Sequence, residues 1–337
     1  MRTIPRLMRA AVPIALAALI LAGTVPSSAA GPTDHRRAVR GARYIASQQA
    51  GNGSVQAFST VGSTADAVLA LVASHQGSYA AFRAVRYLRR HVAKITSVGL
   101  QAKAVMALVA DGRNPRDVNG VNLVATLKAL LDSSGRYGSS AVLDDALTVL
   151  ALEAAGATPP ARAFAWLISA QCPDGGWAYD APYNPSTDDA HCFNGDPVND
   201  FFSSDSNTTA YVVMALEDAN HADWTADPFA FFPTVRDPHH HGWAYTGSTV
   251  STDANSTALV IQAYVSASIA IPSGGMQALR DLQLRCGAWA YNWKGNSPGP
   301  ADIGATIGAV LGIAKAPLPI APGGFDTVHP LDPPACT

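Results

Sequence analysis

A ten-residue pattern occurs six times along the chain, and it limits the folds that the chain can adopt. The copy NTTAYVVMAL at 207–216 aligns without gaps with segments at 62–71, 99–108, 143–152, 255–264 and 304–313. Small residues recur five positions apart in most copies, as in Ala65 and Ala70, which lets helix backbones approach closely. Val, Leu, Ile and Met occupy most other positions, and a helix that is apolar all round is buried all round. The pattern therefore predicts six buried helices.

Amphipathic segments precede several of the buried ones. They are expected as helices at 37–49, 79–91, 119–131, 161–171 and 276–284, while Pro228 and Pro233 interrupt a sixth at 226–235. Six buried helices that alternate with six amphipathic ones predict an all-α closed double ring, the (α/α)6 barrel. An open solenoid would need polar caps at both ends, which the sequence does not show.

The two ends of the chain lie outside this pattern. Arg2, Arg6 and Arg9 precede a short apolar run and a small-residue site at 28–30, as in a secretory signal peptide. We therefore expect a leader at 1–30, a barrel domain at 31–315 and a Pro-rich tail at 316–337 in a secreted protein. The formal net charge of −2 argues against nucleic acid as a partner. One basic cluster is expected to be a solvated helix face: Arg83, Arg86, Arg89 and Arg90.

The chain has four cysteines, an even number that suggests two disulfides in a secreted protein. Three pairings are possible. We favour Cys172–Cys192, which closes a local loop, and Cys286–Cys336, which would tether the Pro-rich tail to the barrel. A zinc site is not expected, because the chain has no Cys-x-x-Cys pair.

The sequence Trp-Ala-Tyr, preceded by glycine within two residues, occurs three times after expected outer helices. The aromatic pairs either mark repeat junctions or converge on one ligand, and both interpretations stay open. The tryptophans are expected to pack between helices, whereas the tyrosine two residues later can point into the mouth of the ring. The six residues are Trp177, Tyr179, Trp243, Tyr245, Trp289 and Tyr291.

The segment at 163–177 resembles the Gln-Trp repeat of squalene–hopene cyclases, with Gln171 followed by Asp174-Gly-Gly-Trp177. Weaker copies occur at 44–55 and 279–289. On these residues the chain is similar to the terpenoid cyclase and protein prenyltransferase superfamily, which implies an α-α barrel over about residues 35 to 315. Neither Asp144-Asp145 nor Asp188-Asp189 completes the Asp-x-Asp-Asp or Asp-Asp-x-x-Asp motif, and the zinc-binding Asp-x-Cys pair is absent. No catalytic residue is therefore assigned.

The transcobalamin and intrinsic factor barrel is the relative whose secreted context this chain most resembles. That resemblance implies a secreted small-molecule binding protein, with a cobalamin-like corrinoid or a hydrophobic cofactor as ligand. Because the β domain of those carriers is missing, the barrel alone, a second subunit or a membrane transporter would close the site. The alternatives are a secreted glycan hydrolase or lyase on the same barrel and a divergent terpene cyclase-like enzyme.

Candidate ligand-binding residues gather where the buried helices begin. Asp205, Asp253 and Asp302 precede three successive buried helices, with Asn207 and Asn255 beside the first two. The three aspartates either surround the mouth as ligand-binding carboxylates or stabilise the helix starts. Asp144, in the first turn of the third buried helix, has the same two interpretations.

Two further segments are weak metal candidates. The insertion at 180–204 carries Asp188 and Asp189 and is interpreted as a lid, a calcium site or an acidic loop tethered by a disulfide. His239 and His241 could supply a metal ligand, including an axial nitrogen to a corrinoid cobalt, or belong to a solvated turn after Pro238.

Overall fold

The computed structural model describes residues 31–138, 141–181, 192, 203–247, 250–326 and 334–336. The predicted leader at 1–30 lies outside this part of the chain, as does most of the insertion at 180–204. Asp188 and Asp189 are among the residues that are not described.

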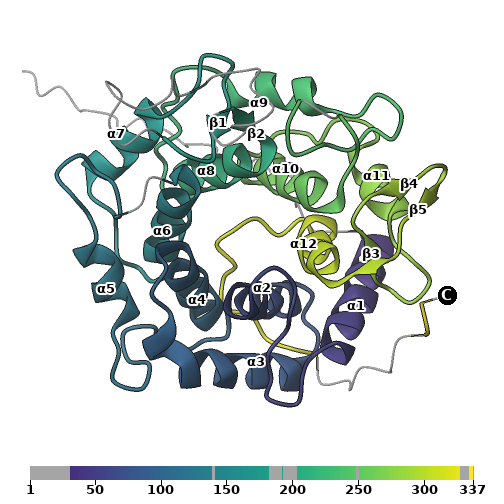
Figure 1. Cartoon of the computed structure of the whole chain (residues 1–337), viewed down its shortest axis with the longest axis horizontal. Helices are drawn as coiled ribbons and strands as arrows, with labels where there is room; N and C mark the ends of the chain where they lie inside the picture. The colour runs from purple at the N-terminus through teal and green to yellow at the C-terminus, as the bar shows by residue number, and fades with distance from the viewer. Residues whose placement is uncertain are drawn as a thin grey trace, which may run out of the picture.

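Six helices form a closed inner ring (Figure 1). Each packs against the next, and the last packs against the first. An open solenoid has no such final contact, so the predicted (α/α)6 barrel is confirmed. The inner helices are α2 (Thr60–Ala73), α4 (Val98–Ala110), α6 (Val142–Ala154), α8 (Ser206–Asp218), α10 (Ala254–Ser266) and α12 (Ile303–Ala314).

An outer layer of helices surrounds this ring. Its members are α1 (Pro32–Ser47), α3 (Ser78–His91) with the 3-10 turn η1 (Val92–Lys94), α5 (Leu123–Ala129), α7 (Ala161–Ser169), α9 (Pro228–Phe231) with the 3-10 turn η3 (Phe232–Val235), and α11 (Gly275–Asp281). The prolines keep α9 short, as expected. The start predicted for α5 at residue 119 was wrong, because Asn122 caps the helix and Val118 pairs with Val121 in a turn before it.

The structure also contains short antiparallel strand pairs between helices, which the all-α prediction did not include. Two of the Trp-Ala-Tyr segments begin with strands that pair with the residues just before an inner helix. These pairs are β1 (Trp177–Ala178) with β2 (Ser204–Asp205), and β3 (Trp289–Ala290) with β6 (Ala301–Asp302). A hairpin of β4 (Trp293–Lys294) and β5 (Ser297–Pro298) lies between the latter two.

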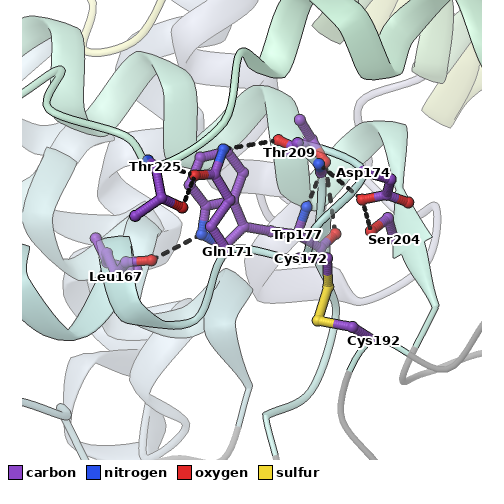
Figure 2. Close-up of a disulfide and its surroundings, with 11 residues drawn as sticks. Leu167, Gln171, Cys172, Asp174, Trp177, Cys192, Ser204, Thr209 and Thr225 are labelled. Atoms are coloured by element: carbon purple, nitrogen blue, oxygen red, sulfur yellow. Dashed lines mark hydrogen bonds between the residues drawn. A yellow bond between two sulfur atoms is a disulfide. The ribbon is translucent and has the colours of Figure 1, made fainter.

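A repeated glutamine contact joins neighbouring outer helices. The Gln171 side-chain amide donates to Gly175 O at 2.9 Å in its own turn and to Ala226 O at 2.7 Å before α9. Its oxygen accepts from the Thr225 hydroxyl, as Figure 2 shows. Gln49 and Gln283 make the equivalent pair of amide contacts at the two weaker copies of the sequence repeat. The Gln-Trp resemblance therefore corresponds to a physical link of the outer ring.

Both predicted disulfides are present, Cys172–Cys192 and Cys286–Cys336. The tail after α12 crosses the middle of the ring in Figure 1. Its backbone bonds to the far ends of the inner helices, with Leu318 N donating to Met214 Sδ and Gly323 N donating to Ala110 O. Leu318 is buried by these contacts. Among the helices described, none combines the length and hydropathy needed to span a bilayer.

Candidate functional site

A cavity of about 360 Å³ lies inside the inner ring. This volume is near the lower end of the roughly 300–1,000 Å³ that ligand pockets occupy. Phe58, which is 80% exposed, lines the cavity next to solvent, and Leu318 of the tail lines it at the opposite end. The tail thus converts the centre of the ring into a pocket with one closed end.

The cavity wall changes character with depth. Asn207 and Asn255 line it from the first turns of α8 and α10, together with Tyr179 and Tyr245 from the Trp-Ala-Tyr segments. One turn further in are Asp66, Lys103 and Tyr211, and a further turn in are Leu69, Gln262 and Leu311. At 1.5 Å per residue, these layers span roughly 10 Å. A ligand would therefore meet amides and phenols first, then charge, and finally a mostly apolar end.

An ion pair occupies the middle layer. Lys103 Nζ on α4 lies 2.7 Å from Asp66 Oδ2 on α2, and both side chains are largely buried. Burial by itself would lower the pKa of Lys103, but Asp66, together with Tyr211 and Asp144, raises it above its ordinary value. The ammonium group therefore stays charged inside the ring.

Asp144 lies close to this pair. A side chain at Gly99 would collide with Asp144 Oδ1, so the absence of a Cβ allows the carboxylate to rest on the backbone of α4. Gly99 is one turn before Lys103 on that helix. Three inner helices, α2, α4 and α6, thus bring two carboxylates and one ammonium group together.

The three predicted rim aspartates are helix caps. Asp205 accepts from Thr208 N at 2.7 Å, Asp253 from Ser256 N at 2.8 Å and Asp302 from Ala305 N at 2.7 Å. None of the three lies on the cavity wall. Of the two interpretations of these residues, stabilisation of the helix starts is the one that the structure shows.

Two of these caps are buried, and burial changes their protonation. It raises the pKa of Asp205 to about 7 and that of Asp253 to about 6. Hydrogen bonds from Thr208 and Ser256 act in the opposite direction but do not cancel the effect of burial. Asp205 therefore keeps its proton in part of the molecules at neutral pH, whereas Asp253 is largely ionised there.

The tryptophans of the three aromatic pairs are structural, as expected. All three are fully buried, and the backbone N–H of each donates to a threonine hydroxyl of the next inner helix. Figure 2 shows this contact between Trp177 and Thr209 and the bond from the indole to Leu167 O. The tyrosines differ, because Tyr179 and Tyr245 line the cavity whereas Tyr291, 40% exposed, does not.

The histidine run forms a turn at the surface. The backbone N–H groups of His239 and His240 both donate to Asp237 Oδ1, and the ring of His240 stacks on Trp293 at 4.2 Å. The described residues contain no group of three or more side chains suited to hold a metal ion. A corrinoid ligand remains a prediction that these contacts do not test.

Sequence reasoning did not single out Asp66, Lys103, Tyr211 or Gln262. Asp66, Lys103 and Tyr211 each occupy the fifth position of their copy of the ten-residue repeat. The other three copies have Leu147, Leu259 and Gly308 at that position. Charged residues at this position in two helices that are predicted to be buried are the signal that could have located the site, because a buried charge needs a partner.

Gln262 has an unused acceptor at the closed end of the cavity. The residue is 1% exposed; its Nε2 donates to Ala258 O at 3.1 Å, while Oε1 has no hydrogen-bond partner among the described residues. An unpaired buried acceptor costs about 1–3 kcal/mol. We therefore expect Gln262→Leu to raise the free energy of unfolding by about 1 kcal/mol in urea denaturation, because the amide bond it loses offsets part of the gain.

Gln101 provides the matched comparison. Its Oε1 is also without a partner in the described part of the chain, but its Nε2 donates to Ile95 O at 2.9 Å and it does not line the cavity. Gln101→Leu should destabilise the protein, since it removes the side-chain donor to Ile95 O, a carbonyl between helices, whereas Ala258 O lies inside α10 and keeps its helical backbone donor in Gln262→Leu. Equal effects of the two substitutions would contradict this account of Gln262.

No protein-family model and no curated protein matches the chain. Solved structures do match it. The α-1,6-mannanase GH76A from Salegentibacter sp. HEL1_6 has 11% identity and a TM-score of 0.55, covering 84% of this chain and 98% of the mannanase. The type II terpene cyclase MstE from Scytonema has 13% identity and a TM-score of 0.57, covering 84% of this chain and 98% of the cyclase.

A third match is the unsaturated glucuronyl hydrolase from Streptococcus agalactiae, with 11% identity and a TM-score of 0.53. The match covers 85% of this chain and 92% of the hydrolase. The expected transcobalamin-like context finds no support in these similarities, whereas a terpene cyclase is among the structures with the same fold. At such low identity they show the fold alone. The chain shares the α-α barrel with glycan hydrolases and with a terpene cyclase.

Proposed function

We propose that this protein is a secreted glycan-active enzyme, a hydrolase or a lyase, that acts at the open end of the cavity. The observation that carries the proposal is the Asp66–Lys103 ion pair on the cavity wall beneath a rim of amides and tyrosines, with Asp144 close to the ammonium group. Two carboxylates near one space can serve as general acid and general base, and a sugar presents hydroxyl groups that such a rim can bind. This replaces the binding-protein interpretation that the sequence favoured.

The structural neighbours support the same class. The mannanase and the glucuronyl hydrolase act on glycans by their names, and an inactive variant of the mannanase has two adjacent aspartates replaced. This chain has the adjacent pair Asp144-Asp145 in the first turn of α6. Asp145 is buried and accepts from Tyr137 N at 2.6 Å. Asp144 is only partly buried and lies beside the cavity wall rather than on it, so of this pair it is the candidate for a role in catalysis.

Each charged residue then has a separate role. One carboxylate, from Asp66 or Asp144, donates a proton to the leaving oxygen, and the other activates water or removes a proton from the sugar. Lys103 holds the Asp66 carboxylate in place through their ion pair. The predicted leader and the two disulfides fit a secreted enzyme.

Activity assays on α-mannan and on uronate-containing glycans test the proposal, with reducing ends and unsaturated products as readouts. We expect Asp66→Asn and Asp144→Asn each to lower kcat/KM at least about 100-fold, since general acid–base catalysis contributes about 10²–10⁴. Asp218→Asn, at the exposed end of α8, is the control and should leave activity unchanged. Wild-type activity in both the Asp66 and the Asp144 variant would refute the assignment.

A second candidate is the binding or cyclisation of an isoprenoid. It is favoured by the apolar end of the cavity, where Leu69, Leu311 and Leu318 gather, and by the structural likeness to a terpene cyclase. Native mass spectrometry of protein purified from culture medium separates the two candidates, because a bound polyprene and a bound oligosaccharide differ in mass pattern. A ligand retained without turnover would favour the small-molecule binding protein instead.

A further inference from the structure

A stripe of cations and aromatic side chains runs along the outer face of α3, far from the cavity lining. We define the α3 stripe as Tyr79, Phe82, Arg83, Arg86, Arg89 and Arg90. Their spacing of three and four residues puts them on one helix face, over a length of roughly 16 Å. The opposite face packs on α2 and buries small and aliphatic side chains such as Ala84 and Leu88.

Three of the four arginines of the α3 stripe are not used to hold the fold; the exception is Arg83, which donates to Ala50 O. Arg86, Arg89 and Arg90 are exposed, and within the described residues they make no salt bridge and no side-chain hydrogen bond. The arginines of α1 behave differently, since Arg37 donates to Arg280 O and Arg40 donates to Leu284 O. Arg89 and Arg90 lie in the last turn of α3, where cations complement the helix dipole. Arg86 has no such role, and like charges three and four residues apart cost free energy.

Charge is concentrated around this helix. Residues 79–117 hold 8 of the 23 basic residues of the chain and only 2 of its 25 acidic residues, and all 8 except Lys103, which pairs with Asp66 inside the ring, lie outside the cavity. At the C-terminal end of the α3 stripe, Arg89 lines a hollow of about 220 Å³ together with Arg113, Asn114 and Asp117. The surface therefore offers a row of free cations that ends in a recess.

The aromatic end of the α3 stripe is equally exposed. Tyr79 is 68% and Phe82 is 47% exposed, and the guanidinium of Arg83 lies 5.7 Å from the centre of the Tyr79 ring. Exposed aromatic faces next to cations suit a ligand that has flat apolar faces as well as negative charge. A pyranose ring bearing a carboxylate or a sulfate has both properties.

We propose that the α3 stripe is a binding surface for an anionic polysaccharide with uronate or sulfate groups, separate from the cavity. Arginine forks pair with the anionic groups, and Tyr79 and Phe82 stack on sugar rings. A lipid surface fits less well, because the apolar face of α3 is packed on α2 and is not available for insertion. The proposal does not depend on the function proposed for the cavity.

The test measures binding of the full-length secreted protein to polygalacturonate at about 50 mM salt, where surface charges are weakly screened. The triple variant Arg86→Gln, Arg89→Gln, Arg90→Gln should bind at least about tenfold more weakly, and the difference should shrink at about 0.5 M salt. The control is Arg36→Gln, Arg285→Gln, Lys294→Gln, which removes the same charge from exposed sites elsewhere and should bind within about twofold of wild type.

A second variant separates stacking from charge. Tyr79→Ala with Phe82→Ala should weaken binding severalfold and leave the dependence on salt unchanged. Equal loss in the α3 and control triple variants would overturn the proposal, as would no binding to polygalacturonate. Equally tight binding to anionic phospholipid vesicles or to duplex DNA would overturn it too. The binding measurement does not depend on glycan hydrolysis, so its result can contradict the proposal for the α3 stripe without contradicting the proposed enzymatic function.

Discussion

Trp289→Ala should lower the free energy of unfolding by about 3–5 kcal/mol, the cost of emptying a fully buried aromatic site. The indole is completely buried, and its ring packs so closely on α1 that a Cβ at Gly41 would collide with it. Its Nε1 donates to Leu279 O at 2.7 Å, a bond that alanine also removes. Because the ring joins α1, α11 and α12, urea denaturation followed by circular dichroism should show the loss as one cooperative transition.

The three related tryptophans allow an internal comparison. Trp177 and Trp289 each donate an indole hydrogen bond to an outer-helix carbonyl, whereas Nε1 of Trp243 has no partner within the described residues. Substitution by phenylalanine should therefore cost about 1 kcal/mol more at Trp177 and Trp289 than at Trp243. Equal costs at all three sites would show that the indole bonds contribute little.

The free energy of unfolding should fall as the pH rises from about 4 to about 7. Burial raises the pKa of Asp205 to about 7, that of Asp145 to about 7 and that of Asp253 to about 6, each from an ordinary value of 3.8. Over this range the unfolded chain has released protons that the folded protein still holds, so rising pH favours unfolding. The contribution is complete below about pH 4 and is lost once the pH passes the folded pKa.

Asp205→Asn isolates one of these groups. Asparagine caps a helix about as well as aspartate but does not ionise, so the variant should lack about 2–4 kcal/mol of the pH-dependent change. The measurement is the difference in unfolding free energy between wild type and variant from about pH 4 to 8, which cancels the shared titration of histidines. Asp281→Asn, at an exposed position, is the control. A constant difference for Asp205→Asn would contradict the raised pKa.

Much of the architecture follows from local sequence. Helices such as α8 and α10 are apolar on every face, so they can be stable only when surrounded, and six of them with amphipathic partners close into a ring. The cysteine spacing sufficed to favour the correct disulfide pairs. The outer helix boundaries were less predictable, as at α5, because short polar turns compete with weak amphipathic helices.

The sequence by itself thus determined the number of buried helices and their closure into a barrel. Only the tertiary structure decided which face of each inner helix lines the cavity, because a helix that is apolar all round has no preferred side. It also decided that Asp205 turns inward as a cap, that Tyr179 faces the cavity while Tyr291 does not, and that Leu318 closes its end. These outcomes depend on which segments meet across the ring, and such long-range contacts leave no periodic signal along the chain.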